Sequence, residues 1–131
     1  MGAIARSIST KEVIWICTDQ QSSNASGSQV SLEYYNTAAS LSARFVSIIL
    51  TCEAKENERR LVASSRGRGN NVKLTDVDIL REVRKNEDIY HFGGEDELEL
   101  ELDVSNRPPE AAAKIIAKFI GSSCSVSLHF L

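Results

Sequence analysis

The chain has 131 residues, of which 42% are hydrophobic and 25% are charged, and its formal net charge is −3. These values predict one soluble globular domain with a core of ordinary size. The negative charge argues against a general affinity for nucleic acid or for anionic membranes. The three cysteines form neither a metal-binding pattern nor a disulfide framework, so we expect a cytoplasmic protein in a reducing setting. No apolar run suits a signal peptide or approaches the ~20 residues of a membrane span.

The first third of the chain predicts a helix, a strand and a second helix. Residues 1–11 have apolar side chains at helical spacing. Residues 13–17 are nearly all apolar and predict a buried strand with Trp15 in the core. A polar, serine-rich stretch over residues 20–28 is typical of a loop. Helical spacing then predicts a second helix over residues 29–43.

The next segment is the one around which the chain is organised. Residues 45–50 form an apolar run rich in β-branched side chains, which suits a strand buried on both faces of a parallel sheet. Thr51 is expected to cap the helix that follows. Arg59 and Arg60 fall late in that helix, and the basic, glycine-containing loop over residues 64–69 comes shortly after. Arginines that lead into such a loop are suited to binding phosphate.

Two helices and one strand are expected in the remainder. Thr75 is expected to cap a helix over residues 76–86. Residues 97–104 alternate between aliphatic and acidic side chains, which indicates a strand with one solvated face at a sheet edge. The last helix is predicted over residues 109–120, with Gly121 as its C-cap.

Strands and helices alternate along the chain, which is typical of a parallel sheet with helices on both faces. We therefore predict an α/β fold in which three parallel strands form the middle layer of an α/β/α arrangement. Residues 1–121 are expected to form this domain. Residues 122–131 are expected to be a C-terminal tail without an assigned role.

Several segments together resemble a P-loop NTPase of the small-molecule kinase type. Asp19 follows an apolar strand, as a Walker B carboxylate does. Residues 48–61 (IILTCEAKENERRL), the basic loop, and the stretches ELELDVS and PPEAAAKIIAKFI resemble the C-terminal two-thirds of gluconate, shikimate and adenylate kinases. Fungal proteins with an AAA-type or kinase-like P-loop domain are similar as well. The resemblance covers residues 10–120 and predicts a partial P-loop kinase-like fold.

The resemblance also implies functional residues. In such kinases a lid carries arginines that close on the nucleotide phosphates, and a loop after a later strand lies against the adenine. Asp19, Arg66 and Arg68 would be catalytic, and Asp19 would also hold Mg²⁺. The intact relatives would transfer the γ-phosphate of ATP to a small hydroxyl-bearing substrate. The residues implied to contact ATP are Arg59, Arg60, Ser105, Asn106, Arg107 and Pro108.

One departure from the family affects its central motif. P-loop kinases need a Gly-Lys-Ser/Thr loop whose amides and lysine cradle the phosphates, and this sequence contains no Gly-Lys pair. Electrostatic clamping supplies nearly all of phosphoryl-transfer catalysis, so without the cradle we expect little or no activity or ATP binding. The sequence therefore suggests a fragment, a truncated gene model or a decayed relative.

Simpler interpretations of the same residues stay open. Asp19 at a strand end is also typical of a turn or a helix cap, and the arginines are also explained as a solvated basic region balanced by nearby glutamates. Two alternatives to the kinase remnant follow. One is a non-catalytic α/β module that binds a protein partner through exposed sheet edges. The other is a small protein that binds polyanions through residues 55–73.

Overall fold

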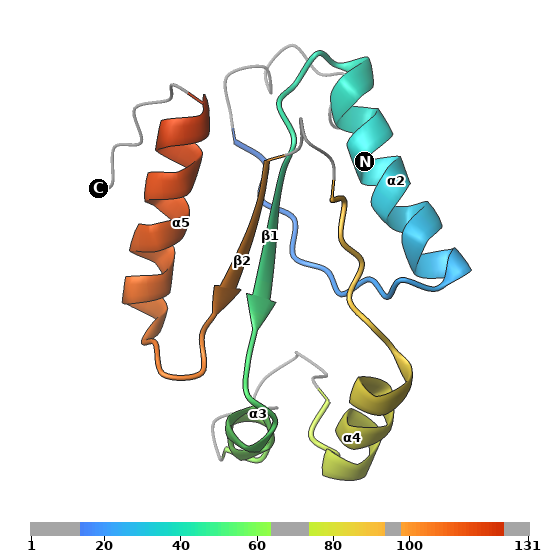
Figure 1. Ribbon diagram of the computed structural model, residues 1–131, viewed down its shortest axis with the longest axis vertical. Helices are drawn as coiled ribbons and strands as arrows, with labels where there is room; N and C mark the ends of the chain where they lie inside the picture. Colours follow the sequence, from blue (N-terminus) through green and yellow to red (C-terminus); the bar gives the residue numbers. More distant parts are fainter. Residues whose placement is uncertain (1–13, 64–73, 94–97, 125–131) are drawn as a thin grey trace. The chain divides into compact units, whose positions relative to one another are not determined.

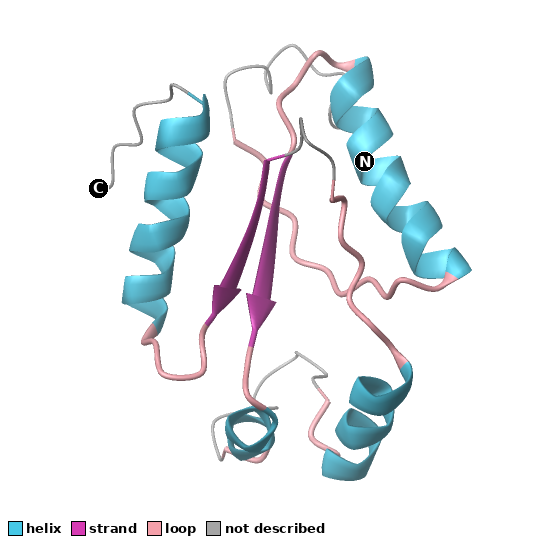
Figure 2. Ribbon diagram, viewed as in Figure 1, coloured by secondary structure: helices cyan, strands magenta, loops and turns pink. Residues whose placement is uncertain are grey.

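A computed structural model describes residues 14–63, 74–93 and 98–124. The chain divides into two compact units. The first unit comprises Met1–Val46 and Glu87–Glu97, and the second comprises Ser47–Asn86 and Leu98–Leu131. The described residues contain four helices and two paired strands, so the chain is a mixed α/β protein (Figures 1 and 2).

The second unit is built on two parallel strands, β1 (Val46–Thr51) and β2 (Leu98–Asp103). The ladder continues past the end of β2, where the Val104 amide donates to the Thr51 carbonyl at 2.8 Å. Parallel strands need a crossover connection, and α3 (Ala54–Leu61) and α4 (Val77–Asn86) lie within it. Both strands and their parallel orientation are therefore confirmed, as are the two intervening helices.

A small apolar core holds the second unit together. Its buried aliphatic side chains come from both strands and two helices: Ile49, Leu61, Leu102 and Ala112. The last helix, α5 (Pro109–Cys124), packs against β2. The large apolar side chains of this helix, Ile115, Ile116 and Phe119, are half-buried.

Two predicted N-terminal helix caps are wrong. Thr51 belongs to β1, and Glu53 takes the N-cap position of α3. At α4, the carboxylate that accepts the first helical amides belongs to Asp76 and not to Thr75; it accepts from Asp78 at 2.9 Å and from Ile79 at 3.1 Å. Both amides donate to the same oxygen, Oδ1, and a carboxylate that accepts from the first helical amides is typical of an aspartate N-cap.

The predicted end of the last helix is also wrong. Gly121 lies within α5, which continues to Cys124, so residues 122–124 belong to the helix and not to a tail. A glycine inside a helix costs about 1 kcal/mol relative to alanine, which is small enough for the surrounding helix to outweigh.

The first unit contains α2 (Ala25–Ser40), which begins and ends earlier than the predicted helix over residues 29–43. Asn24 explains the early start, because its Oδ1 accepts from the Gly27 amide at 2.9 Å and caps the helix. The serine-rich stretch was predicted to be loop from composition alone, but a good N-cap in front of it favours helix.

The predicted first strand is wrong, because residues 14–17 have no regular secondary structure. A strand needs a neighbour for its amides and carbonyls. The antiparallel bridge in this unit forms further along the chain, between Ser22 and Ile89. Two hydrogen bonds flank it, from Ser23 to Asp88 at 2.8 Å and from Tyr90 to Gln21 at 3.0 Å.

The placement of Trp15 in the core is also wrong, since its side chain is 52% exposed. The sheet of the described residues thus has two strands instead of three. The complete three-layer arrangement of a P-loop fold stays a prediction.

Aromatic side chains hold the first unit together. Phe45 and Phe92 lie edge to face with ring centroids 4.8 Å apart, and Tyr90 meets Phe92 nearly at right angles at 5.1 Å. Tyr35 on α2 contacts Phe45 at 5.7 Å, also edge to face. All four side chains are half-buried. The cluster ties α2 to the chain before β1 and to the segment that follows α4.

Three predicted features lie outside the described residues: the helix over residues 1–11, the basic loop over residues 64–69, and residues 125–131 of the tail. Among the helices that are described, none combines the length and the apolar character that a membrane crossing requires.

Candidate functional site

The polar residues of the second unit gather where β1 and β2 end. In open parallel sheets, ligands commonly bind outside the carboxyl ends of the strands, because the loops there meet at one edge. Here the two loops are Cys52–Glu53, after β1, and residues 104–108, after β2. The predicted adenine-contacting residues lie in the second of these loops.

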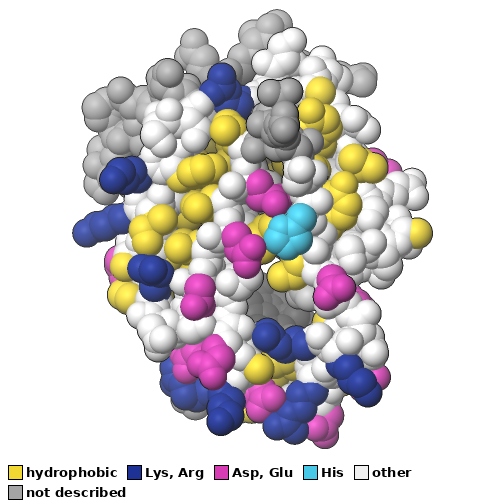
Figure 3. Space-filling view, in the orientation of Figure 1, with side chains coloured by type: hydrophobic (Ala, Val, Ile, Leu, Met, Phe, Trp, Pro, Cys, Tyr) yellow, Lys and Arg dark blue, Asp and Glu magenta, His cyan; other side chains and the backbone are white. Residues whose placement is uncertain are grey.

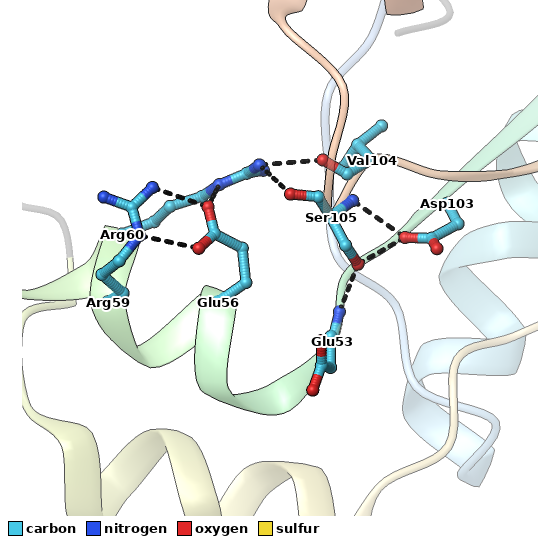
Figure 4. Close-up of polar contacts among 7 residues, drawn as sticks. All are labelled: Glu53, Glu56, Arg59, Arg60, Asp103, Val104 and Ser105. Atoms are coloured by element: carbon cyan, nitrogen blue, oxygen red, sulfur yellow. Dashed lines mark hydrogen bonds and ion pairs between the residues drawn. The ribbon is translucent and has the colours of Figure 1, made fainter.

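Ser105 joins the two loops (Figure 4). Its side chain is only 7% exposed. The hydroxyl accepts a hydrogen bond from the Glu53 amide at 2.7 Å and donates one to Asp103 Oδ1 at 2.5 Å. The Ser105 amide donates to the same carboxylate oxygen at 2.8 Å. The buried hydroxyl thus both donates and accepts a hydrogen bond within the protein, which indicates a structural role.

The same hydrogen bonds lower the pKa of Asp103 below its ordinary value. The larger effect comes from the Ser105 hydroxyl and the smaller one from the Ser105 amide. The carboxylate therefore stays ionised at neutral pH and keeps accepting both bonds.

Arg60 also connects α3 to the loop after β2. One of its terminal nitrogens donates to the carbonyls of Val104 and Ser105, each at 2.8 Å (Figure 4). Its Nε donates to Glu56 at 2.7 Å. The guanidinium thus neutralises a carboxylate and satisfies two carbonyls that no strand partner uses.

Arg59 shares Glu56 with Arg60. It forms a two-point contact in which Nε and a terminal nitrogen each lie 2.7 Å from the carboxylate. Hydrogen bonds from Arg59 and then Arg60 lower the pKa of Glu56 from 4.5 to about 2. The carboxylate is therefore charged throughout the physiological range and holds both guanidiniums.

This geometry bears on the predicted phosphate contacts of Arg59 and Arg60. An incoming phosphate would have to compete with Glu56 for both guanidiniums. Arg59 is the more accessible, with 70% of its side chain exposed against 35% for Arg60. Moving Arg60 would also break its hydrogen bonds to two backbone carbonyls, whereas moving Arg59 would break only its contacts with Glu56 among those described.

The remaining loop residues, Asn106, Arg107 and Pro108, are exposed. Arg107 donates from Nε to the Asp103 carbonyl at 3.0 Å. The predicted contacts of the three residues with ATP stay predictions.

Helix α4 contributes two further arginines to the second unit. Arg81 forms a two-point contact with Glu58 of α3 at 2.8 and 2.9 Å. Arg84 donates to the carbonyl of Cys52 at 3.2 Å, directly after β1. These side chains hold α3 and α4 together, and each basic group is met by an acceptor.

Asp19, the predicted catalytic and Mg²⁺-binding residue, lies in the first unit at the surface. Its Oδ1 accepts from the Gln20 amide at 2.8 Å, and its Oδ2 accepts from Gln21 at 2.6 Å and from Tyr34 at 3.2 Å. Gln21, followed by the Gln20 amide, lowers the pKa of Asp19 below its ordinary value. This is the arrangement of a turn aspartate, and the metal role stays a prediction.

The structure leaves the two lid arginines untested, because Arg66 and Arg68 lie outside the described residues. Within residues 14–63, 74–93 and 98–124, no three histidine, cysteine or acidic side chains lie close enough to share a metal ion.

Sequence reasoning missed the polar contacts that organise this site. The spacing of Glu56 with Arg59 and Arg60, three and four residues on, is a readable signal for ion pairs on one helix face. Asp103 and Ser105 also have the spacing of a side chain that accepts from the amide two residues later. No local signal, however, predicts the bond between Glu53 and Ser105, which are 52 residues apart.

The described residues also expose large apolar side chains to solvent. Four aliphatic side chains are buried, whereas ten large apolar side chains are exposed. Figure 3 shows apolar side chains open to solvent on the face in view. The ten exposed side chains are distributed over both units.

Comparison of the chain with protein-family models, with curated proteins and with solved structures finds no match in any of the three.

Proposed function

We propose that this chain is a non-catalytic α/β interaction module that receives an extended polypeptide segment along the outer edge of β1. The observation that carries the proposal is the pairing of the sheet. Strand β1 pairs with β2 on one side, and no strand among the described residues pairs with its other side. An open strand edge presents a row of backbone donors and acceptors that an incoming segment can use.

The two outer edges of the sheet differ in charge, and the difference favours β1. Strand β2 carries Glu99, Glu101 and Asp103, and charged side chains on an edge strand discourage pairing with another chain. Strand β1 has the sequence VSIILT and carries no charge. Its Leu50 is 51% exposed although it belongs to a strand with a buried neighbour, Ile49.

The ligand that fits this edge is an extended, uncharged segment rich in β-branched or aromatic residues. Backbone hydrogen bonds would supply affinity along the strand, and alternate side chains would contact exposed apolar atoms such as those of Leu50. A charged ligand would lose solvation at an edge that offers no opposite charge.

A labelled peptide of alternating valine and threonine with lysines only at its ends tests this proposal by fluorescence anisotropy. We expect saturable binding that is lost when a central residue of the peptide is proline, because proline cannot donate to the ladder. Leu50→Lys should weaken binding, whereas Ile79→Lys on α4, at a side chain 52% exposed, should leave it unchanged. Equal binding of the proline peptide, or no effect of Leu50→Lys, would contradict the proposal.

A second candidate is the remnant of a nucleotide-dependent kinase. One observation favours it: arginine and polar side chains gather at the carboxyl ends of two parallel strands, the position that nucleotides take in related architectures. We expect ATP·Mg to bind weakly or not at all, because no Gly-Lys pair is present to form a phosphate cradle. Calorimetric titration that gives micromolar affinity would contradict this expectation and favour the kinase remnant.

A further inference from the structure

Arg84 of α4 lies at the carboxyl end of the outer edge of β1. The Thr51 carbonyl accepts from the Val104 amide at 2.8 Å, so it faces β2. Successive carbonyls of an extended chain point to opposite sides, so the Cys52 carbonyl faces away from β2, and it accepts from Arg84 at 3.2 Å. The guanidinium therefore lies where the next amide of a neighbouring strand would donate.

We propose that the segment bound along the outer edge of β1 is the C-terminal end of a polypeptide, which runs parallel to β1 and places its free carboxylate on Arg84. This inference rests on the proposed function of the β1 edge and names the chemistry of the partner. Capture of a terminal carboxylate is a known companion of strand addition, because the end group then fixes where the segment stops.

The backbone geometry favours a chain end in this orientation. Because Thr51 faces β2, the backbone groups of Leu50 and Ile48 face the outer edge, and a parallel segment would pair with them before it reaches Arg84. A chain that continued further would have to displace the guanidinium from the Cys52 carbonyl. In the opposite orientation the segment would bring its N-terminal ammonium to Arg84, where like charges repel.

The charges around Arg84 favour a carboxylate. Glu58 of α3 interacts electrostatically with Arg84, but its carboxylate is held by a two-point contact with Arg81 at 2.8 and 2.9 Å. A guanidinium has five N–H donors, so Arg84 can bind a carboxylate while it keeps its contact with Cys52. Lys85, in the same last turn of α4, adds positive charge. The segment can therefore stay uncharged along β1 and carry its one charge at its end.

Two forms of the valine–threonine peptide test this inference by fluorescence anisotropy. Both lack the C-terminal lysine and carry the label at the amino end; one ends in a free carboxylate and the other in a carboxamide. We expect the carboxylate form to bind the wild-type chain about threefold to fivefold more tightly, the upper range for a solvent-exposed ion pair. At ~1 M salt, where the Debye length is about 3 Å, the two affinities should converge.

Variants of α4 assign this preference to one side chain. Arg84→Gln should abolish the difference between the two forms, whereas Arg84→Lys keeps the positive charge and should retain part of it. Lys85→Gln, at the neighbouring exposed position, is the matched control and should leave the difference unchanged. The two affinities are compared as a ratio within each variant, so a partial loss of folded protein does not change the result.

The outcomes separate this inference from the proposed function. Equal affinities of the two forms for the wild-type chain, or a difference that Arg84→Gln leaves unchanged, overturn the carboxylate contact. If both forms still bind in a Leu50-dependent manner, the β1 edge keeps its proposed function and only the end group is wrong. If neither form binds, both proposals fail.

Discussion

The two units of the chain are stabilised in different ways. All four buried aliphatic side chains of the described residues belong to the second unit. There they are joined by contacts between residues far apart in the sequence, such as Glu53 with Ser105 and Arg60 with Val104. In the first unit, the buried residues of α2 are Gly27 and Ser31, and the aromatic cluster is only half-buried.

This difference predicts that the two units differ in stability. Burial of aliphatic groups is the main favourable term in folding, so the second unit should resist unfolding more strongly than the first. The first unit, in turn, carries the segment over residues 14–17, whose apolar side chains face solvent. The second unit thus carries the strand edge of the proposed function, and the first unit carries the exposed apolar side chains of residues 14–16.

The largest expected effect is on the core of the second unit. Leu61 is 2% exposed, and Leu61→Ala should lower the free energy of unfolding by about 2–5 kcal/mol because it leaves a cavity. Val62→Ala is the control next to it, since Val62 is 59% exposed. Urea denaturation followed by circular dichroism measures both. Equal effects of the two variants would mean that α3 is not anchored by Leu61.

The next largest effect is expected from the loss of the Ser105 hydrogen bonds. Ser105→Ala removes the acceptor of the Glu53 amide and one donor to Asp103, and should cost about 1–3 kcal/mol because a partly buried amide loses its partner. Ser122→Ala on α5 removes an exposed hydroxyl that donates to the Phe119 carbonyl, and it should be nearly neutral. A Ser105 variant as stable as the Ser122 variant would show that the two loops do not depend on this contact.

The next prediction concerns Gly27 in the first unit. This glycine is buried, and a Cβ added there would clash with the backbone of Ser22. Gly27→Ala should therefore cost about 1–3 kcal/mol, the usual range for overpacking, because the Ser22 backbone is held by its bridge to Ile89. Ser26→Ala, at an exposed neighbouring position, is the control in the same thermal unfolding experiment. A stabilising effect of Gly27→Ala would indicate that the loop does not pack on α2 as described.

The smallest effect is electrostatic and depends on pH. The pKa of Glu56 is lowered from 4.5 to about 2, so its contacts with Arg59 and Arg60 stabilise the fold above pH 4.5 and lose that effect as the pH falls toward about 2. Glu56→Gln should lower the melting temperature at neutral pH, and its difference from the wild type should shrink as the solution becomes acidic. Glu82→Gln, where the carboxylate accepts from the Asn86 amide, is the control. A difference that grows in acid would contradict the assignment.

The sequence predicted the second unit better than the first. Strand β1, helices α3 and α4, and strand β2 follow from local patterns: a β-branched run, charges placed at helix ends, and strict alternation of leucine with acids. Residues 13–17 have an equally apolar pattern, yet residues 14–17 form no strand. Composition alone does not reveal whether a neighbouring strand is available to pair with.

The candidate site was less predictable than the fold. Arg59, Arg60 and Ser105 were selected from the sequence by resemblance, and the structure does bring Arg60 and Ser105 into contact. Glu56 fits the simpler interpretation in which nearby glutamates balance the arginines, whereas the Glu53 amide as the partner of Ser105 was not foreseen. A basic side chain is conspicuous in a sequence, whereas the acceptor that satisfies it depends on which loops meet in space.

The most direct test of the proposed interface is hydrogen exchange of the wild-type chain with and without the valine–threonine peptide, resolved by mass spectrometry. The account predicts that the amides of residues 46–51 gain protection when the peptide is bound, because the outer edge of β1 then shares hydrogen bonds with it. The amides of α4, outside the proposed interface, should be unaffected. Protection of residues 46–51 that does not change when the peptide is added would contradict the account.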